Sequence, residues 1–358
     1  MDRLRGIAVL LVIAWHAFSI PTFFGVAMPS AVQILNDALS TYRIPALLVL
    51  SGLLLGRSLA KPLPTYYLGK VRHIAWPFLV WSLIYLLANP GGADGLSADY
   101  WLGGSYLWYL LVIGFCYAIA PLVRRVPAFA VLTVLVLVLS SLRGAGSDLV
   151  YVLMDAPYFF VGVAAAPLVP RLLRAPGWAV LIAAVVAILW GVYSAWHYGY
   201  APRLHVVGFP VSLLGVFSLA WVLNRVSSLP WLEWVGRHSL QFYVVHFPVM
   251  VVAVRFGAVS LPRQLVYLVL LLAAVGVPAL FARFAAGSVL FELPDPRRNA
   301  EAPAKSAIRK RGGARLDRVD VLAPGSGLTG AQGAQHEQEP PGADQREALE
   351  HRVHRQGH

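Results

Sequence analysis

Residues 2–16 read DRLRGIAVLLVIAWH, and ten apolar or glycine residues separate Arg5 from His16. In an α-helix this spacing makes about three turns and a rise of about 16 Å, so both side chains lie on one face. An ionisable side chain inside so apolar a segment is costly. His16 is therefore a candidate functional residue, although a neutral histidine that hydrogen-bonds a neighbouring helix explains it equally well.

Apolar runs of this kind continue along most of the chain. Of its 358 residues, 58% are hydrophobic and 13% are charged, whereas a soluble globular domain has about 25% charged residues. The runs lack the alternation of a β-barrel, and Pro, Gly and short polar loops interrupt them. The sequence therefore predicts an all-α polytopic membrane protein.

Turn residues and charges divide the apolar chain into about ten expected transmembrane helices. They lie near residues 7–27, 42–57, 74–89, 105–123, 128–142, 149–169, 177–196, 204–224, 238–255 and 263–286. Several of these ranges are shorter than the ~20 residues that cross a bilayer comfortably. The number of helices is therefore a firmer prediction than their ends.

The basic residues predict the orientation of these helices. One set of alternate loops carries Arg3, Arg5, Arg57, Lys61, Lys70, Arg72, Arg124, Arg125, Arg171, Arg174, Arg225, Arg237 and Arg283. The other set carries Arg43, Arg143, Arg203, Arg255 and Arg263. Because loops rich in Lys and Arg stay in the cytoplasm, we expect a multi-pass protein of the cytoplasmic membrane with both termini inside the cell.

The end of the chain has a different composition. Residues 294–358 contain 11 Lys and Arg, 9 Asp and Glu and no aromatic residue. Such a segment cannot bury enough apolar surface to offset its chain entropy. We therefore expect a membrane domain over residues 1–290 and a disordered cytoplasmic tail over residues 291–358.

The remaining polar residues near or inside the expected helices each have two interpretations. Ser239, Tyr243 and His246 share one helix face, where they either join helices by hydrogen bonds or line a polar cavity. Asp155 either pairs with an imidazole or, as we prefer, caps a helix that begins at the following residues. Lys70, Arg72 and His73 either hold phosphates or anchor the chain at the membrane surface.

Other catalytic templates are missing from the sequence. It contains no P-loop, no GxSxG, no HExxH and no CxxC, which are the patterns of phosphate, serine, zinc and thiol chemistry. We expect no metal site.

Several motifs occur in the order found in a known family. DRLRGIAVLLVIAWH resembles the N-terminal Arg-x10-His signature of the membrane-bound acyltransferase 3 family. Further similar segments are RIPALLVLSGLLL (43–55), KVRHIAWPFLVWSLIYL (70–86), YLWYLLVIGFCYAIAPLV (106–123), PYFFVGV (157–163) and HSLQFYVVHFPV (238–249). The resemblance covers about residues 2–290.

The resemblance implies transfer of an acyl group, usually acetyl, from cytosolic acyl-CoA to a hydroxyl of a sugar, glycan or glycolipid. Arg5 and His16 then form the essential pair. Arg5, Lys70, Arg72 and His73 are expected to bind the donor, which is a co-substrate and not a resident cofactor. The acceptor is expected near Ser239, Tyr243, His246, Trp108 and Asp155. Expected partners are these substrates and the lipid bilayer, and no nucleic acid.

The chain departs from the family pattern before the third expected helix. The family usually has Arg-x-x-Arg there, whereas this sequence has Lys70-Val-Arg72-His73. Lysine holds a phosphate without the bidentate fork of arginine, and a histidine is only partly charged at pH 7. This departure puts the affinity for the donor, or the activity itself, in question.

The role of His16 has two chemical versions. It can act as a general base on the acceptor hydroxyl or carry the acyl group itself, and the sequence does not separate them. A transporter or flippase for a lipid-linked sugar, with the same polar residues along its path, is the alternative function.

Overall fold

The computed structural model of the chain describes residues 1–90, 94–142, 148–199, 207–285 and 288–294. These residues contain helices and no strand. Met1–Pro294 forms one compact unit. The predicted all-α fold is confirmed, and its apolar helices make the chain a multi-pass membrane protein.

The helices of this unit are named in chain order. They are α1 (Asp2–Phe23), α2 (Ser30–Leu53), α3 (Leu55–Leu59), α4 (Leu63–Lys70), the π-helical turn η1 (Val71–Ala75), α5 (Trp76–Ala88), η2 (Tyr100–Gly104), α6 (Trp108–Ile119), α7 (Ala128–Ser141), α8 (Asp148–Leu153), α9 (Ala156–Ala165), η3 (Ala166–Leu168), α10 (Val169–Leu172), α11 (Gly177–Tyr198), α12 (Gly208–Arg225), α13 (Pro230–Arg237), α14 (Ser239–Arg255), η4 (Ala258–Ser260) and α15 (Arg263–Phe284).

Each expected span coincides with an apolar helix of the described chain. Six helical stretches are long and apolar enough to cross a membrane, namely Asp2–Phe23, Ser30–Leu59, Leu63–Ala88, Gly177–Tyr198, Gly208–Arg225 and Leu265–Phe284. Four shorter apolar stretches correspond to the other spans: Trp108–Ile119, Ala128–Ser141, Ala156–Leu172 and Ser239–Arg255. The largest difference is in the second span, where α2 begins at Ser30, twelve residues before the expected start at 42.

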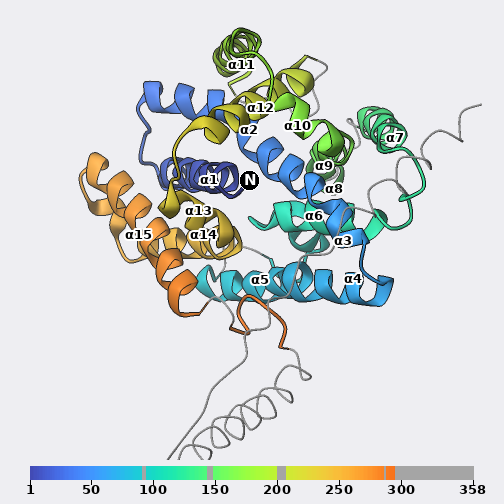
Figure 1. Cartoon of the computed structure of the whole chain (residues 1–358). Helices are drawn as coiled ribbons and strands as arrows, with labels where there is room; N and C mark the ends of the chain where they lie inside the picture. The colour runs from blue at the N-terminus through green and yellow to red at the C-terminus, as the bar shows by residue number, and fades with distance from the viewer. Residues whose placement is uncertain (91–93, 143–147, 200–206, 286–287, 295–358) are drawn as a thin grey trace, which may run out of the picture. The chain divides into compact units, whose positions relative to one another are not determined.

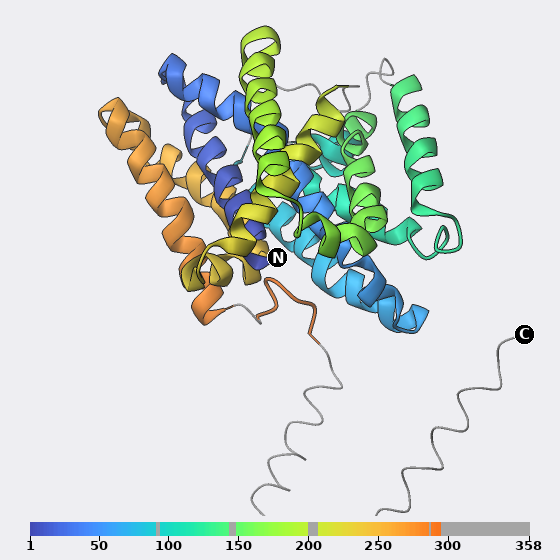
Figure 2. The same ribbon diagram turned by 45° about the horizontal axis from the view of Figure 1, so that its top comes forward.

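α1 is the central helix of the unit. It packs against α2, α12, α13, α14 and α15, and Figure 1 looks nearly along its axis, with these helices around it. Its buried residues include Ala8, Val12 and Ile13, which recur at helical spacing. In Figures 1 and 2, α15 and α7 lie at opposite edges of the unit. The segment with the Arg-x10-His spacing thus forms the axis of the bundle.

Two glycines allow α2 and α9 to touch through their backbones. A Cβ added to Gly52 would lie 1.9 Å from the Phe159 carbonyl oxygen, and one added to Gly162 would lie 2.2 Å from the Val49 carbonyl oxygen. No side chain fits at either position. Small residues at such crossings permit the close packing that holds membrane helices together.

The compact unit extends four residues beyond the predicted domain boundary at residue 290. Phe291 is buried, with 1% of its surface exposed, so residues 291–294 pack with the helices and do not belong to the predicted tail. The apolar residues 289–291 are too few to form a further span, so no sequence pattern assigned them to the compact unit. The rest of that tail, residues 295–358, lies outside the described residues.

We expect Gly52→Ala to destabilise the bundle by about 1–3 kcal/mol, because the added methyl group forces α2 and α9 apart. The measurement is the thermal unfolding midpoint of the purified protein in detergent. Gly56→Ala is the matched control, since a Cβ there meets no atom within 4 Å. Equal midpoints for the two variants would contradict the proposed backbone contact.

Candidate functional site

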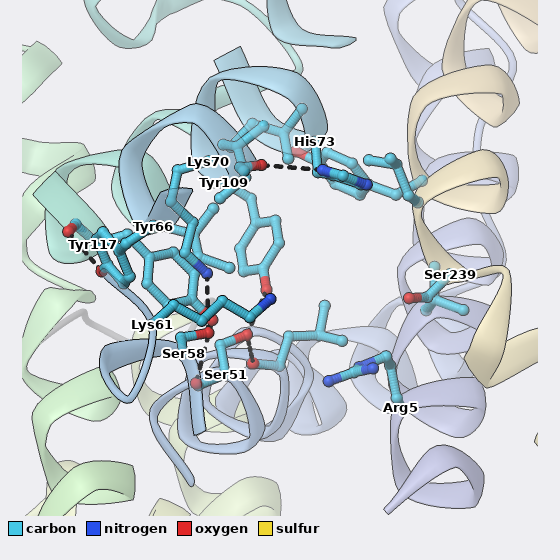
Figure 3. A pocket seen from close by; sticks show the side chains of 18 of the residues that line it. Arg5, Ser51, Ser58, Lys61, Tyr66, Lys70, His73, Tyr109, Tyr117 and Ser239 are labelled. Carbon is cyan, nitrogen blue, oxygen red and sulfur yellow. Dashed lines mark hydrogen bonds between the residues drawn. The ribbon is translucent and has the colours of Figure 1, made fainter. Parts of the chain in front are cut away.

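A cavity of about 420 Å³ opens beside the N-terminal half of α1. Several helices of the bundle contribute polar side chains to it, as Figure 3 shows for Arg5 of α1, Ser51 of α2, Lys70 of α4, Tyr109 of α6 and Ser239 of α14. Because these segments lie far apart in the sequence, only their packing creates the cavity.

The cavity is basic. Arg5, Lys61 and Lys70 line it, and no Asp or Glu occurs among the described residues of its wall. In Figure 3, Lys61 and Lys70 face it from one side and Arg5 from the opposite side. Arginine and lysine are the usual ligands of phosphate groups. The cavity therefore suits an anionic ligand that carries phosphates.

Lys70 is held against the wall by two contacts. Its Nζ donates a hydrogen bond of 3.2 Å to Ser58 Oγ and lies 3.5 Å from the centre of the Tyr117 ring. The Tyr117 hydroxyl in turn donates to the Ser51 carbonyl oxygen at 3.2 Å. An ammonium group fixed in this way costs less side-chain entropy when it binds a ligand.

Arg72 does not reach the cavity, although the sequence predicted that it binds the donor with its neighbours. Its Nη2 lies 2.9 Å from Glu292 Oε1, and its Nε donates to the Leu293 carbonyl oxygen at 3.0 Å. Lys70 and His73, on either side of it, both line the cavity. The helix passes through the π-helical turn η1 here, and such turns change which residues share a face.

His16 lies deeper in the bundle, in contact with a second histidine. His246 Nε2 of α14 lies 3.2 Å from His16 Nδ1, and the ring centres are 5.1 Å apart. His246 is fully buried, whereas His16 keeps some exposed surface. The two histidines that the sequence placed in separate helices thus form a pair.

The hydrogen-bond partners of the pair determine where the protons sit. His16 Nδ1 lies 3.0 Å from the Val12 carbonyl oxygen, and His246 Nδ1 lies 3.1 Å from the Phe242 carbonyl oxygen. Because a carbonyl oxygen only accepts, we assign the hydrogen of each neutral ring to Nδ1. With this assignment, the one His16 Nδ1 hydrogen is shared between the Val12 carbonyl oxygen and His246 Nε2, and His16 Nε2 carries no hydrogen.

Tyr243 separates the basic cavity from the histidine pair. It lines the cavity, and its ring centre is 6.0 Å from that of His246, one turn further along α14. Its hydroxyl donates to the Tyr106 carbonyl oxygen at 2.9 Å. Tyr243 is therefore a residue of the cavity wall that contacts the His246 side of the pair.

Comparison with known families matches residues 1–283 to the acyltransferase 3 family, described as an acyltransferase domain. The chain belongs to the acyltransferase 3 family. This match covers both the basic cavity and the histidine pair. Comparisons with curated proteins and with solved structures find no match.

The acyltransferase brings together some of the residues that the sequence assigned to the acceptor. Ser239 and Tyr243 line the basic cavity instead, and His246 contacts His16. Asp155 occupies the N-cap position of α9 but is buried, and its side chain makes no capping hydrogen bond to that helix. Trp108 begins α6, and neither Trp108 nor Asp155 lines the cavity.

A polar cluster on α2 was missed by the sequence reasoning. Arg43 lies over the Trp15 ring, 4.7 Å from its centre, and donates to the Asn36 carbonyl oxygen at 2.9 Å. Asp37 interacts with Arg43 through its charge, and Arg43 interacts likewise with His16. Asn36, Asp37 and Arg43 are all buried. The residues that could have revealed this cluster are the polar ones within 36–43. The sequence analysis assigned most of them to a loop before the second span, whereas they belong to α2.

We expect Lys70→Met to weaken the binding of coenzyme A about tenfold, which is about 1.4 kcal/mol, because one charged phosphate ligand is lost. The dissociation constant is measured by titration calorimetry on the detergent-purified protein. Arg57→Met is the control, since Arg57 precedes Ser58 in α3 but does not line the cavity. Equal weakening by both variants would assign the effect to general charge and not to the cavity.

Proposed function

We propose that this acyltransferase is a membrane-bound O-acyltransferase that moves an acyl group, in the simplest case acetyl, from cytosolic acyl-CoA to a hydroxyl of a sugar, glycan or glycolipid. The observation that supports the proposal is the position of the basic cavity: its wall includes Tyr243, whose ring lies 6.0 Å from the His246 ring of the His16–His246 pair. In the proposed complex, the anionic head of the donor lies near Arg5 and the reacting group lies near His16, further along α1.

The donor binds with its phosphates in the basic cavity, near Arg5, Lys61 and Lys70. Its thioester arm passes Tyr243 and places the reacting carbonyl near His16. The rise of about 16 Å between Arg5 and His16 sets the distance between these two ends of the donor. The face with the cavity is then the cytoplasmic one, in agreement with the positive-inside rule.

His16 acts as the general base in this mechanism. Its Nε2 removes the proton of the acceptor hydroxyl as the oxygen attacks the thioester carbonyl. The tetrahedral intermediate collapses to the ester, the C–S bond breaks, and the proton passes from His16 to the coenzyme A thiolate. His246 accepts a hydrogen bond from His16 Nδ1 throughout, so it orients the ring and stabilises the imidazolium that forms.

The acceptor approaches from the side of the α2 cluster. A tryptophan ring with guanidinium, carboxylate and amide groups nearby suits a sugar, whose C–H face packs on an aromatic ring and whose hydroxyls both donate and accept hydrogen bonds. Trp15 adjoins His16 in the chain, and Arg43 lies over the Trp15 ring. Donor and acceptor therefore reach His16 from opposite ends of α1.

We expect His16→Ala to abolish transfer of radiolabelled acetyl from acetyl-CoA, because the variant removes the Nε2 that takes the proton of the acceptor hydroxyl. Coenzyme A binding should stay within about twofold of wild type, since the cavity is intact. The assay follows thiol release and labelled ester in detergent with a panel of sugar acceptors. Label retained on the wild-type protein without acceptor would favour an acyl-histidine route, and unchanged turnover of the variant would remove His16 from the chemistry.

We expect His246→Ala to lower kcat about 10- to 100-fold with little change in the donor KM, because the variant removes the group that orients His16. His238→Ala is the matched control, since His238 also contacts a carbonyl one turn earlier, at 2.9 Å from Trp234, but is not part of the pair. A raised donor KM with normal kcat would instead place His246 in donor binding.

The alternative function, a transporter or flippase for a lipid-linked sugar, is tested with the same protein reconstituted in vesicles. Movement of a lipid-linked sugar across the membrane without consumption of acetyl-CoA would contradict the proposed reaction.

A further inference from the structure

The residues after α15 form a strap over the cytoplasmic edge of the proposed donor site. This C-terminal strap, residues 288–294, follows α15 and runs beside α5, as the orange segment below α5 in Figure 1 shows. The indole nitrogens of two tryptophans hold it: Trp76 Nε1 donates to the Val289 carbonyl oxygen at 2.6 Å, and Trp81 Nε1 donates to the Leu290 carbonyl oxygen at 2.9 Å.

An aromatic anchor fixes the strap between α5 and α15. Phe291 is 1% exposed, and its ring stacks on Trp81 with the centres 5.6 Å apart. It also meets the edge of Phe281 of α15, at 5.9 Å between ring centres. A buried aromatic with two aromatic partners is a substantial apolar contact. These aromatic contacts therefore hold the strap in place independently of the charge of Glu292, the residue that follows Phe291.

That next residue, Glu292, faces the basic residues at the edge of the cavity. Its Oε1 lies 2.9 Å from Arg72 Nη2 and 3.6 Å from His73 Nε2. His73 Nδ1 donates to the Gly69 carbonyl oxygen at 2.9 Å, which turns Nε2 towards the carboxylate. Because His73 also lines the cavity, one anionic side chain touches the wall of a site that is otherwise basic.

We propose that Glu292 sets the affinity for the donor, by occupying as an internal anion the position at Arg72 and His73 that a phosphate of acyl-CoA would otherwise take. This inference rests on the proposed function, because it assigns the residue to the same donor site. It also explains why Arg72, next to two residues that line the cavity, is directed to the strap.

The effect is electrostatic and moderate in size. Glu292 keeps 25% of its side-chain surface exposed and Arg72 keeps 14%, so solvent weakens both their attraction to each other and the repulsion of a donor phosphate. The carboxylate charge opposes binding of coenzyme A at the edge of the cavity, while its removal ends this repulsion and leaves His73 Nε2 accessible to a phosphate.

The test is Glu292→Gln in the full-length protein, since glutamine keeps the size of the side chain and the strap keeps its anchors. We expect the dissociation constant of coenzyme A, measured by titration calorimetry, to fall about three- to tenfold at low salt. The difference from wild type should narrow as salt is added, because salt screens the carboxylate. The acetyl-CoA KM should fall in parallel, without a rise in kcat.

Glu233→Gln is the matched control. Glu233 forms an ion pair of 2.7 Å with Arg3, of similar exposure, but does not line the basic cavity, so this variant should leave the dissociation constant unchanged. Phe291→Ala provides an independent test, because it releases the strap and should also tighten binding.

The outcomes separate the two proposals. Failure of the wild-type protein to bind coenzyme A would overturn the proposed function. Binding by wild type with an equal or larger dissociation constant for Glu292→Gln would overturn the role of Glu292 alone, and so would unchanged or weaker binding by a folded Phe291→Ala protein.

Discussion

The contact between His16 and His246 is the interaction on which the rest of the site depends. It joins α1 to α14 at a depth where an unpartnered imidazole would be costly. The carbonyl oxygen beside each Nδ1 assigns the hydrogen of each neutral ring to that atom, so the His16 Nδ1 hydrogen is shared between the Val12 carbonyl oxygen and His246 Nε2. His16 Nε2 is then the nitrogen without a hydrogen, which is the atom that the proposed mechanism uses.

The basic cavity complements this pair because α1 contributes to both. Arg5 stands at one end of the segment and His16 three turns further along. α1 also packs against α2, α12, α13, α14 and α15, so neighbouring helices on several sides hold the segment that carries both side chains. Any substrate that uses both ends is therefore positioned by one rigid helix, which suits a reaction that depends on alignment.

Some basic side chains of this protein form ion pairs with glutamates, and others line the basic cavity. The three cations of the cavity face one another across it without a carboxylate on the described wall. Arg3 and Arg72, close to them in sequence, are each matched by a glutamate from a distant segment. The arrangement leaves the uncompensated positive charge in the cavity, where an anion can use it.

The fold could be predicted from the sequence because a bilayer admits few alternatives. Apolar runs without β alternation must become helices, so the ten apolar helices could be located within several residues. The ends were less certain: the polar residues 36–43 hid the first half of α2, and Phe291 hid the end of the compact unit. In the first place, packing against neighbouring helices overrode a polar composition, and in the second it held an apolar segment too short to be a span.

By itself, the sequence determined that Arg5 and His16 share a helix face and that Ser239, Tyr243 and His246 share another, because helical periodicity is a local property. Only the tertiary structure decided which of these faces meet. It paired His246 with His16, placed Ser239 and Tyr243 in the basic cavity, and turned Arg72 away to Glu292. The physical reason is that contacts between residues more than 200 positions apart depend on how whole helices pack, which no local pattern encodes.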